Sequence, residues 1–305
     1  MIRKTVRPSL PRSLGVLLTA VLLPLAPLGA QDDLEKNRVS AGQGDAESQF
    51  LLGRAYDRGE NVPKDTAKAA EWYRKAAEHG YAKAQHNLGT LYVAGSGVAR
   101  DDTEAAKWFR AAAEQGAALA QDALGAMLEH GQGVPKDIPQ AVSWYEKAAA
   151  QGLPAAQWHA GVCYLLGNEY GVGKDYAAAA QWLEKAANAG LAEAQNALGT
   201  MHENGLGMPK DDEAAFALYQ KAAEKGNAKA QSNLGRFYAS GIATGRDVVK
   251  ACQWLLLSRD QGEVTGTIQL NGLGFELEPA EVEKVKQLVA EFRATHGANP
   301  RAPSH

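Results

Sequence analysis

The sequence predicts an all-α solenoid, built from six tandem helix-turn-helix repeats with a capping helix at each end. Two observations carry this prediction. A pattern of 36 residues that starts with glycine recurs along the chain, and it lengthens once, to 38 residues, in the fourth copy. Each copy contains two stretches of helical periodicity separated by a glycine-rich turn. Because such repeats bury a continuous core against their neighbours, we expect an elongated array.

Residues 1–30 have the features of a signal peptide. They combine a basic start with an apolar run, Leu14 to Leu28, and a small-residue cleavage site after Ala30. The run is 15 residues long, whereas a membrane-spanning helix needs about 20. An uncleaved membrane anchor is the alternative interpretation. We expect an exported protein without membrane insertion after cleavage, most simply located in a bacterial periplasm.

The charge of the remaining chain excludes two classes of partner. Four of the 32 Lys and Arg residues and none of the 35 Asp and Glu residues lie in the first 30 residues, which leaves 28 basic against 35 acidic residues, or −7. An acidic chain without a basic run is not typical of proteins that bind nucleic acids or anionic membranes. We therefore expect protein partners and no nucleic acid.

The expected segments follow in order after the signal peptide. Residues 31–43 form an N-terminal capping segment, and the repeats then occupy residues 44–262. Residues 263–294 form a C-terminal capping segment, and residues 295–305 a disordered tail. The individual copies are residues 44–79, 80–115, 116–151, 152–189, 190–225 and 226–261. The final helix is amphipathic, and its apolar stripe consists of Val282, Val285, Val289 and Phe292.

Three residue types, glycine, aspartate and glutamine, recur at four fixed positions in each copy. A glycine ends the first helix, helix A, where a left-handed backbone favours glycine, and an aspartate is the expected N-cap of the second, helix B. A glycine inside helix A costs about 1 kcal/mol relative to alanine, which predicts that helices A and B approach too closely there for a side chain. A glutamine on helix A is expected to bridge backbone groups of neighbouring helices. In this order, the residues are Gly59, Gly95, Gly131, Gly167, Gly205 and Gly241; Asp65, Asp101, Asp137, Asp175, Asp211 and Asp247; Gly53, Gly89, Gly125, Gly161, Gly199 and Gly235; and Gln49, Gln85, Gln121, Gln157, Gln195 and Gln231.

These motifs resemble a known repeat family. The combination A-x-A-Q-x-x-L-G-x-x-Y, then G-x-G-V-P-K-D, then A-x-x-W-Y-x-K-A-A, at a period of 36 residues, is similar to the Sel-one-like repeat, a relative of the tetratricopeptide repeat. The resemblance covers Gly44 to about Gly262. It implies a right-handed superhelix of helix pairs with the A helices on its concave face. It also implies a binding scaffold of the kind used in signalling, secretion and cell-envelope assembly.

The sequence contains no recognisable catalytic or metal site. Cys163 and Cys252 are two repeats apart, on the order of 20 Å, whereas a disulfide needs Cα atoms within about 7 Å. No two of the seven histidines have the spacing of metal ligands on a helix. A cysteine-rich branch of the family, associated with β-lactam binding or hydrolysis, has a disulfide in each repeat, which this chain lacks. We expect no disulfide, metal, cofactor or enzymatic activity.

The candidate contact residues lie where the copies differ, at repeat positions 4, 7, 11 and 14 of helix A. This stripe is apolar in the fourth copy, at Ala155, Trp158, Val162 and Leu165, and charged towards the ends of the array. An exposed tryptophan there would be a binding hot spot. The alternative is that Trp158 fills the space left by Ala160 in its own repeat. The predicted partner-binding residues are Phe50, Arg54, His86, Leu119, Glu129, Ala155, Trp158, Val162, Leu165 and Tyr170.

The preferred hypothesis is an exported, non-enzymatic scaffold that binds a peptide or helix of a partner protein in the groove lined by the A helices. One alternative is a cell-envelope hydrolase acting on β-lactams or peptidoglycan, for which the sequence supplies no site. Another is a structural protein that associates weakly with itself through the apolar stripe.

Overall fold

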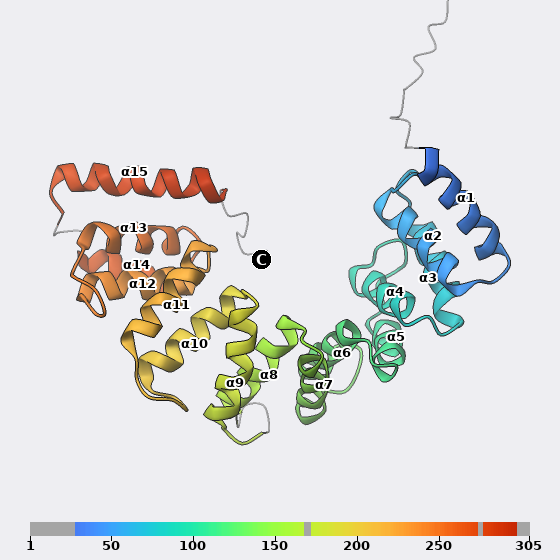
Figure 1. Ribbon diagram of the computed structural model, residues 1–305, viewed down its shortest axis with the longest axis horizontal. Coiled ribbons are helices and arrows are strands. Elements are labelled where there is room, and N and C mark those ends of the chain that lie inside the picture. The colour runs from blue at the N-terminus through green and yellow to red at the C-terminus, as the bar shows by residue number, and fades with distance from the viewer. Residues whose placement is uncertain (1–27, 168–171, 274–276, 298–305) are drawn as a thin grey trace, which may run out of the picture.

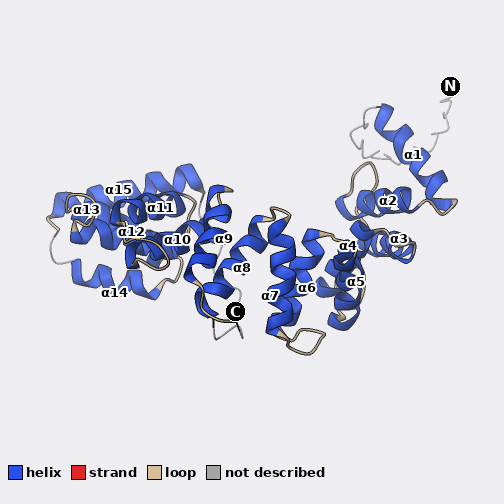
Figure 2. Ribbon diagram, turned by 60° about the horizontal axis from the view of Figure 1, so that its bottom comes forward, coloured by secondary structure: helices blue, strands red, loops and turns tan. Residues whose placement is uncertain are grey.

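The computed structural model describes residues 28–167, 172–273 and 277–297. Within these ranges the chain forms fifteen α-helices and no strand (Figures 1 and 2). The helices are α1 (Leu28–Gly42), α2 (Ala46–Arg58), α3 (Thr66–Glu78), α4 (Ala82–Ala94), α5 (Asp102–Glu114), α6 (Ala118–His130), α7 (Ile138–Ala150), α8 (Pro154–Leu166), α9 (Tyr176–Asn188), α10 (Ala192–Asn204), α11 (Asp212–Glu224), α12 (Ala228–Ser240), α13 (Val248–Arg259), α14 (Val264–Leu273) and α15 (Pro279–His296).

The helices form an open arc, and the predicted all-α solenoid of six repeats is confirmed. The A helices are α2, α4, α6, α8, α10 and α12, and each packs on the B helix that follows it. Each B helix also packs on the next A helix, which joins one repeat to the next. In Figure 1, α4, α6 and α8 lie on the inner side of the arc, and α5, α7 and α9 lie on the outer side.

Local chemistry sets the helix ends. Each of the six predicted aspartate N-caps accepts a hydrogen bond from a backbone N–H of the following first turn. The predicted left-handed glycine is present at five of the six ends of helix A. The prediction is wrong at Gly167, whose φ is 62° but whose ψ is −102°. The turn after Gly167 is two residues longer than its equivalents, so the chain leaves helix α8 in another direction.

The glycines inside the A helices mark the closest approach between the two helices of a repeat, as predicted. A Cβ at Gly53 would lie 2.7 Å from the Tyr73 ring, and one at Gly125 would lie 2.7 Å from the Tyr145 ring. A real Cβ does not come so close to another atom. Each glycine therefore makes room for the large side chain that helix B inserts against helix A.

The recurring glutamine bridges neighbouring helices, which confirms the structural interpretation of its repetition. Gln121 donates from Nε2 to the Ala113 carbonyl on the preceding helix B at 3.1 Å, and its Oε1 accepts from Gln151 at 2.8 Å. The other five glutamines make the equivalent bond to a backbone carbonyl. These glutamines are buried, so the bonds satisfy polar groups that would otherwise oppose packing.

The two ends of the array are capped differently. Gln49 donates to the Ala41 carbonyl of α1 at 3.1 Å, so α1 takes the place of a helix B before the first repeat. At the other end, α15 lies over α13 (Figure 1), where Phe292 meets Trp254 edge to face with ring centroids 5.3 Å apart. Val285 and Val289 are buried in this contact, as the predicted stripe requires. Helix α15 extends to His296, and residues 298–305 of the expected tail lie outside the described residues.

The buried core follows the array as a chain of clusters between successive helices. These clusters lie between α3 and α4, from α5 to α8, between α9 and α10, and from α11 to α13 together with α15. Cys163 and Cys252 are buried in two different clusters. The flanks of each helix A are buried in this packing. The side that faces the inside of the arc therefore remains for other contacts.

Candidate interaction surface

A position on helix B alternates between tyrosine in the odd copies and an apolar residue in the even copies. Along the chain it holds Tyr73, Phe109, Tyr145, Leu183, Tyr219 and Leu255. Position 14 of helix A alternates in step between an acid and an apolar residue. It holds Asp57, Val93, Glu129, Leu165, Glu203 and Ala239. The structure explains this coupling, because Tyr145 donates to Glu129 at 2.7 Å and Tyr219 donates to Glu203 at 2.8 Å.

The third and fourth copies are also joined by a polar contact between their A helices. His159 Nδ1 on α8 lies 2.7 Å from Asp122 Oδ1 on α6, and both side chains are largely buried. The His159 ring stacks on Tyr145, with centroids 4.6 Å apart. The polar side chains on this part of the surface therefore already have partners within the protein.

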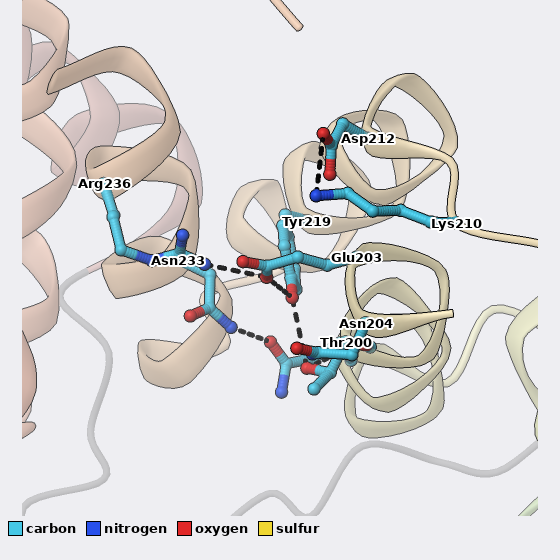
Figure 3. A network of polar contacts seen from close by, with 9 residues as sticks. Thr200, Glu203, Asn204, Lys210, Asp212, Tyr219, Asn233 and Arg236 are labelled. Carbon is cyan, nitrogen blue, oxygen red and sulfur yellow. Dashed lines mark hydrogen bonds and ion pairs between the residues drawn. The ribbon is translucent and has the colours of Figure 1, made fainter. Parts of the chain in front are cut away.

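The fifth and sixth copies form a second network of the same kind (Figure 3). Arg236 on α12 donates to Glu203 on α10 at 2.7 Å, and Glu203 also accepts from Tyr219. Asn233 on α12 donates to Asn196 on α10 at 3.0 Å. Glu203 thus neutralises Arg236 and satisfies a buried hydroxyl at once, which links two repeats through one carboxylate.

Trp158 is neither fully exposed on the inner surface nor fully buried in the core. Its side chain is half-buried and packs against the core cluster of α9 and α10, as does Leu165. Its ring also contacts His159, with centroids 4.9 Å apart. Ala155 and Val162 are half-buried on the same helix. Tyr170, predicted to lie beside them, falls outside the described residues.

A pocket of about 430 Å³ lies on helices α2, α4 and α6, and it gathers four of the predicted contact residues: Phe50, Arg54, His86 and Leu119. We call it the basic pocket. Its remaining lining residues are Arg58, Ala82, Lys83, Asn87, Ala117 and Ala118. Leu119 is 58% exposed, the largest exposure of a leucine in the repeats. The lining thus contains three cations, one histidine and no carboxylate.

Two residues that line this pocket carry a buried polar atom without a hydrogen-bond partner among the described residues, at Arg54 Nε and His86 Nδ1. The Tyr73 hydroxyl is a third such atom, on a buried ring that packs against Phe50. Arg54 Nε lies 3.7 Å from Glu60 Oε2, which is an ion-pair distance but too long for a hydrogen bond. Burial lowers the pKa of His86, which disfavours its charged form.

The Tyr73 hydroxyl beneath the pocket differs from the hydroxyls of the other odd copies. Its helix A partner is Asp57, which is one methylene shorter than the glutamates that Tyr145 and Tyr219 use. Burial, with a smaller effect of Asp57, raises the pKa of Tyr73 to about 12, against the opposing effect of Asn87 and of the two nearby arginines. The first repeat therefore lacks the bond from tyrosine to acid that the third and fifth copies make.

The sequence identified some of these residues and missed others. Phe50, Arg54, His86 and Leu119 were predicted as contact residues, and the structure brings them together. Arg58, Lys83 and Asn87 were not among the predicted contact residues. Arg54 and Arg58 are four residues apart, but Lys83 follows 25 residues later, so no local pattern in the sequence marks the three as one group. Glu129 was predicted for partner binding, but it is engaged by Tyr145.

Two groups on α8, Cys163 and Tyr164, have pKa values raised well above their ordinary range. Burial, followed by the charge of Glu129, raises the pKa of Cys163 to about 12. Tyr164 donates to Glu146 at 2.5 Å, and this bond raises its pKa to about 12. Since the thiolate is the reactive form of cysteine, the raised pKa disfavours reaction at Cys163 at neutral pH.

The described parts of the chain contain neither a metal-binding cluster nor a membrane-spanning helix. In these parts of the chain, no three or more His, Cys, Asp or Glu side chains are grouped as a metal ion would require. None of the described helices has both the length and the apolar composition for crossing a membrane.

The chain is similar to several solved structures. A Sel1 repeat protein from Oxalobacter formigenes is 36% identical, with 80% of this chain and 70% of that chain covered and a TM-score of 0.66. The protective antigen c5321 of uropathogenic Escherichia coli strains, which has an SLR fold, is 27% identical over 86% of this chain and 72% of its own, with a TM-score of 0.40. The immunity protein Pa5087 from Pseudomonas aeruginosa is 21% identical over 80% and 86%, with a TM-score of 0.42. No curated protein matches the chain.

Six segments of the chain match the Sel1 repeat, at residues 46–81, 82–116, 118–153, 154–191, 192–227 and 228–263. Each segment begins two residues after the glycine that opens the corresponding copy. Sel1 repeat proteins are generally non-enzymatic scaffolds that mediate interactions between proteins. With matches across most of its length and a solved relative at 36% identity, this chain belongs to the Sel1 repeat family.

Proposed function

We propose that this protein is an exported, non-enzymatic scaffold that binds a peptide or helix of a partner protein along the inner side of its arc. One observation carries the proposal. The repeated residues of helix A are consumed by packing and by helix-to-helix hydrogen bonds, whereas four residues that vary between copies line a single open pocket. A surface that varies over a constant framework is the arrangement expected of a recognition site.

The location of the binding surface is tested with a photoreactive amino acid placed at single positions. Leu119 is exposed on the inner helix α6, and Lys107 is exposed on the outer helix α5. We expect the probe at position 119 to crosslink a partner from an envelope extract, and the matched probe at position 107 to give no such product. Equal yields at both positions would contradict the inner-surface assignment.

Export is proposed from the composition of residues 1–30. Helix α1 starts at Leu28, so cleavage after Ala30 would shorten it by three residues. The hydrogen bond from Gln49 to the Ala41 carbonyl would remain. Mass spectrometry of the protein recovered from a periplasmic fraction should give an N-terminus at or near Gln31. Recovery of the intact chain from the cytoplasm would contradict export.

The absence of enzymatic activity is tested with purified protein on peptidoglycan and on a chromogenic β-lactam. We expect no turnover above that of the buffer, because the described residues place no base beside an activated nucleophile and Cys163 is held protonated. Turnover that a single polar substitution abolishes would overturn this part of the proposal.

A further inference from the structure

We infer that the basic pocket on α2, α4 and α6 binds an acidic segment of a partner protein that carries an apolar side chain. The inference rests on the proposed scaffold function and specifies the chemistry of the ligand. In this assignment, carboxylates of the partner lie against Arg54 and Lys83, and its apolar side chain lies between Phe50 and Leu119. Three independent features of the pocket support the assignment.

The first feature is a pair of buried polar atoms without hydrogen-bond partners among the described residues. Arg54 Nε and His86 Nδ1 belong to residues that line the basic pocket. Gln195, His202 and Ser232 on α10 and α12 also carry such atoms, but these residues do not line the pocket. A buried polar atom without a hydrogen bond costs free energy, so a ligand that supplies a partner to either atom gains from binding here.

The second feature is charge. Arg54, Arg58 and Lys83 line the pocket together with no carboxylate, although the chain has more acidic than basic residues. Glu60 lies beside the pocket and contacts both arginines, at 3.7 Å from Arg54 and 3.4 Å from Arg58. Asp57 lies near the same arginines, since all three act on Tyr73. Two carboxylates against three cations leave an excess of one positive charge. Lys83 is exposed and has no ion-pair partner within the described parts of the chain, so an incoming carboxylate meets no competing acid.

The third feature is an apolar wall that is already in place. The Phe50 ring packs against Tyr73 and Tyr81, with centroids 5.8 Å and 5.2 Å away, so its position is fixed before binding. Leu119 projects from the other side of the pocket and is 58% exposed. The volume of about 430 Å³ falls within the range of about 300–1,000 Å³ for small binding pockets. It accommodates a short peptide segment and is too small for a whole helix with its side chains.

The test uses the whole protein, immobilised, as the target for a displayed library of short random peptides. Peptides enriched on the protein over the bare support are synthesised with a fluorophore, and their affinities are measured by fluorescence anisotropy. We expect enrichment of peptides with two or more acidic residues beside an aliphatic or aromatic residue. Lys83→Glu should weaken their binding at least about tenfold, because it replaces attraction with repulsion.

The chain supplies a matched control for this substitution. Lys229 occupies the same repeat position as Lys83, but in the sixth copy and beside Glu193. Lys229→Glu should leave the affinity within about twofold of the unsubstituted protein. The effect of Lys83→Glu should shrink between about 0.05 M and about 0.5 M salt, because mobile ions screen exposed charges. Leu119→Ser should weaken binding without changing the dependence on salt.

The outcomes separate this inference from the scaffold proposal. Enriched peptides that bind Lys83→Glu and Lys229→Glu equally would overturn the pocket assignment and leave the scaffold function intact. Enrichment of basic or uncharged peptides, or of none, would also overturn the inference, and crosslinking at position 119 would then decide the scaffold function alone. Light scattering that shows a dimer lost in Lys83→Glu would assign the pocket to a second copy of this chain and would equally overturn it. Thermal unfolding monitored by circular dichroism verifies that each variant is folded.

Discussion

At the scale of single residues, the pairing of a tyrosine on helix B with an acid on helix A explains most of the polar structure on the inner side of the arc. The pair spans the two helices of one repeat, and it recurs only in the odd copies. A glutamate reaches the hydroxyl in the third and fifth copies, whereas Asp57 in the first copy does not. Asp57 is one methylene shorter than these glutamates, and the Tyr73 hydroxyl is left without the hydrogen bond that Tyr145 and Tyr219 make.

This difference predicts that the same substitution, tyrosine to phenylalanine, changes the free energy of unfolding at one position and hardly at the other. Tyr145→Phe should lower the free energy of unfolding by about 1–3 kcal/mol, because Glu129 loses a donor in a partly buried place. Tyr73→Phe should change it by less than about 0.5 kcal/mol, because its hydroxyl makes no hydrogen bond with the described residues. Urea-induced unfolding measures both. Equal losses would show that the Tyr145–Glu129 bond does not stabilise the fold.

The glycines inside the A helices predict a second pair of results. Gly125→Ala should destabilise the protein by about 1–3 kcal/mol, since the new Cβ would lie 2.7 Å from the Tyr145 ring. Gly245→Ala is the control, because Gly245 has no atom within 4 Å of the position where a Cβ would stand. Its effect should stay within about 0.5 kcal/mol. Thermal unfolding of both variants tests the close approach, which a stabilising Gly125→Ala would contradict.

Cys163 predicts how stability depends on alkaline pH. Its pKa is raised to about 12 in the folded protein, whereas a thiol in an unfolded chain titrates near about 8.5. The unfolded state therefore loses its proton first, so the contribution of Cys163 is complete below about pH 8.5 and declines as the pH rises towards 12. Between about pH 8 and about pH 10.5, the free energy of unfolding should fall more in the unsubstituted protein than in Cys163→Ala. Parallel pH profiles of the two proteins would contradict the buried, protonated thiol.

At the scale of the helices, the repeats are joined by glutamine bridges that differ in completeness. Gln121 both donates and accepts a hydrogen bond, to Ala113 and from Gln151. Gln195 donates to Ala187, but its Oε1 has no partner among the described residues. The fifth copy places Lys225 where the second, third and sixth copies place glutamine, and this lysine donates to the Gly190 carbonyl instead.

The two glutamine bridges therefore predict that a change of glutamine to methionine lowers the stability by different amounts at the two positions. Gln121→Met should destabilise the protein by about 1 kcal/mol more than Gln195→Met, because it removes one more hydrogen bond from a buried place. The midpoints of thermal unfolding give the comparison directly. A larger loss for Gln195→Met would show that the second bond of the bridge contributes nothing to the stacking of repeats.

The helices also show which parts of the fold could be read from the sequence. Caps, turns and internal glycines were predicted because each depends on the chemistry of one or a few adjacent residues. Helix α14 was not predicted, although Gly262 follows Gly226 by 36 residues and has the same positive φ of about 84°. Thr267 stands at the glutamine position and Asn271 at the internal glycine position of this incomplete seventh helix A. Helix α15 accordingly packs on α13 rather than completing a seventh pair with α14.

At the scale of the whole molecule, the inner surface of the arc is divided into two parts. The part from α6 to α12 carries networks of paired polar side chains, and the part on α2, α4 and the start of α6 carries the basic pocket. The sequence directed attention to Trp158 in the centre, because the tryptophan stood out among its equivalents. It could not show that Trp158 packs on α9 and α10, or that residues from three copies form one pocket, since both depend on how the repeats stack.

The position of a partner along the inner side of the arc can be tested in one experiment, because lysines lie on both the inner and the outer helices. Lys83 and Lys229 lie on A helices, and Lys107, Lys147 and Lys185 lie on B helices. The native complex is treated with a lysine-reactive crosslinker, and the linked peptides are identified by mass spectrometry. We expect links to the partner at Lys83, and at Lys229 if the partner extends along the groove, with few at the three outer lysines. Links concentrated at Lys107, Lys147 and Lys185 would contradict this expectation.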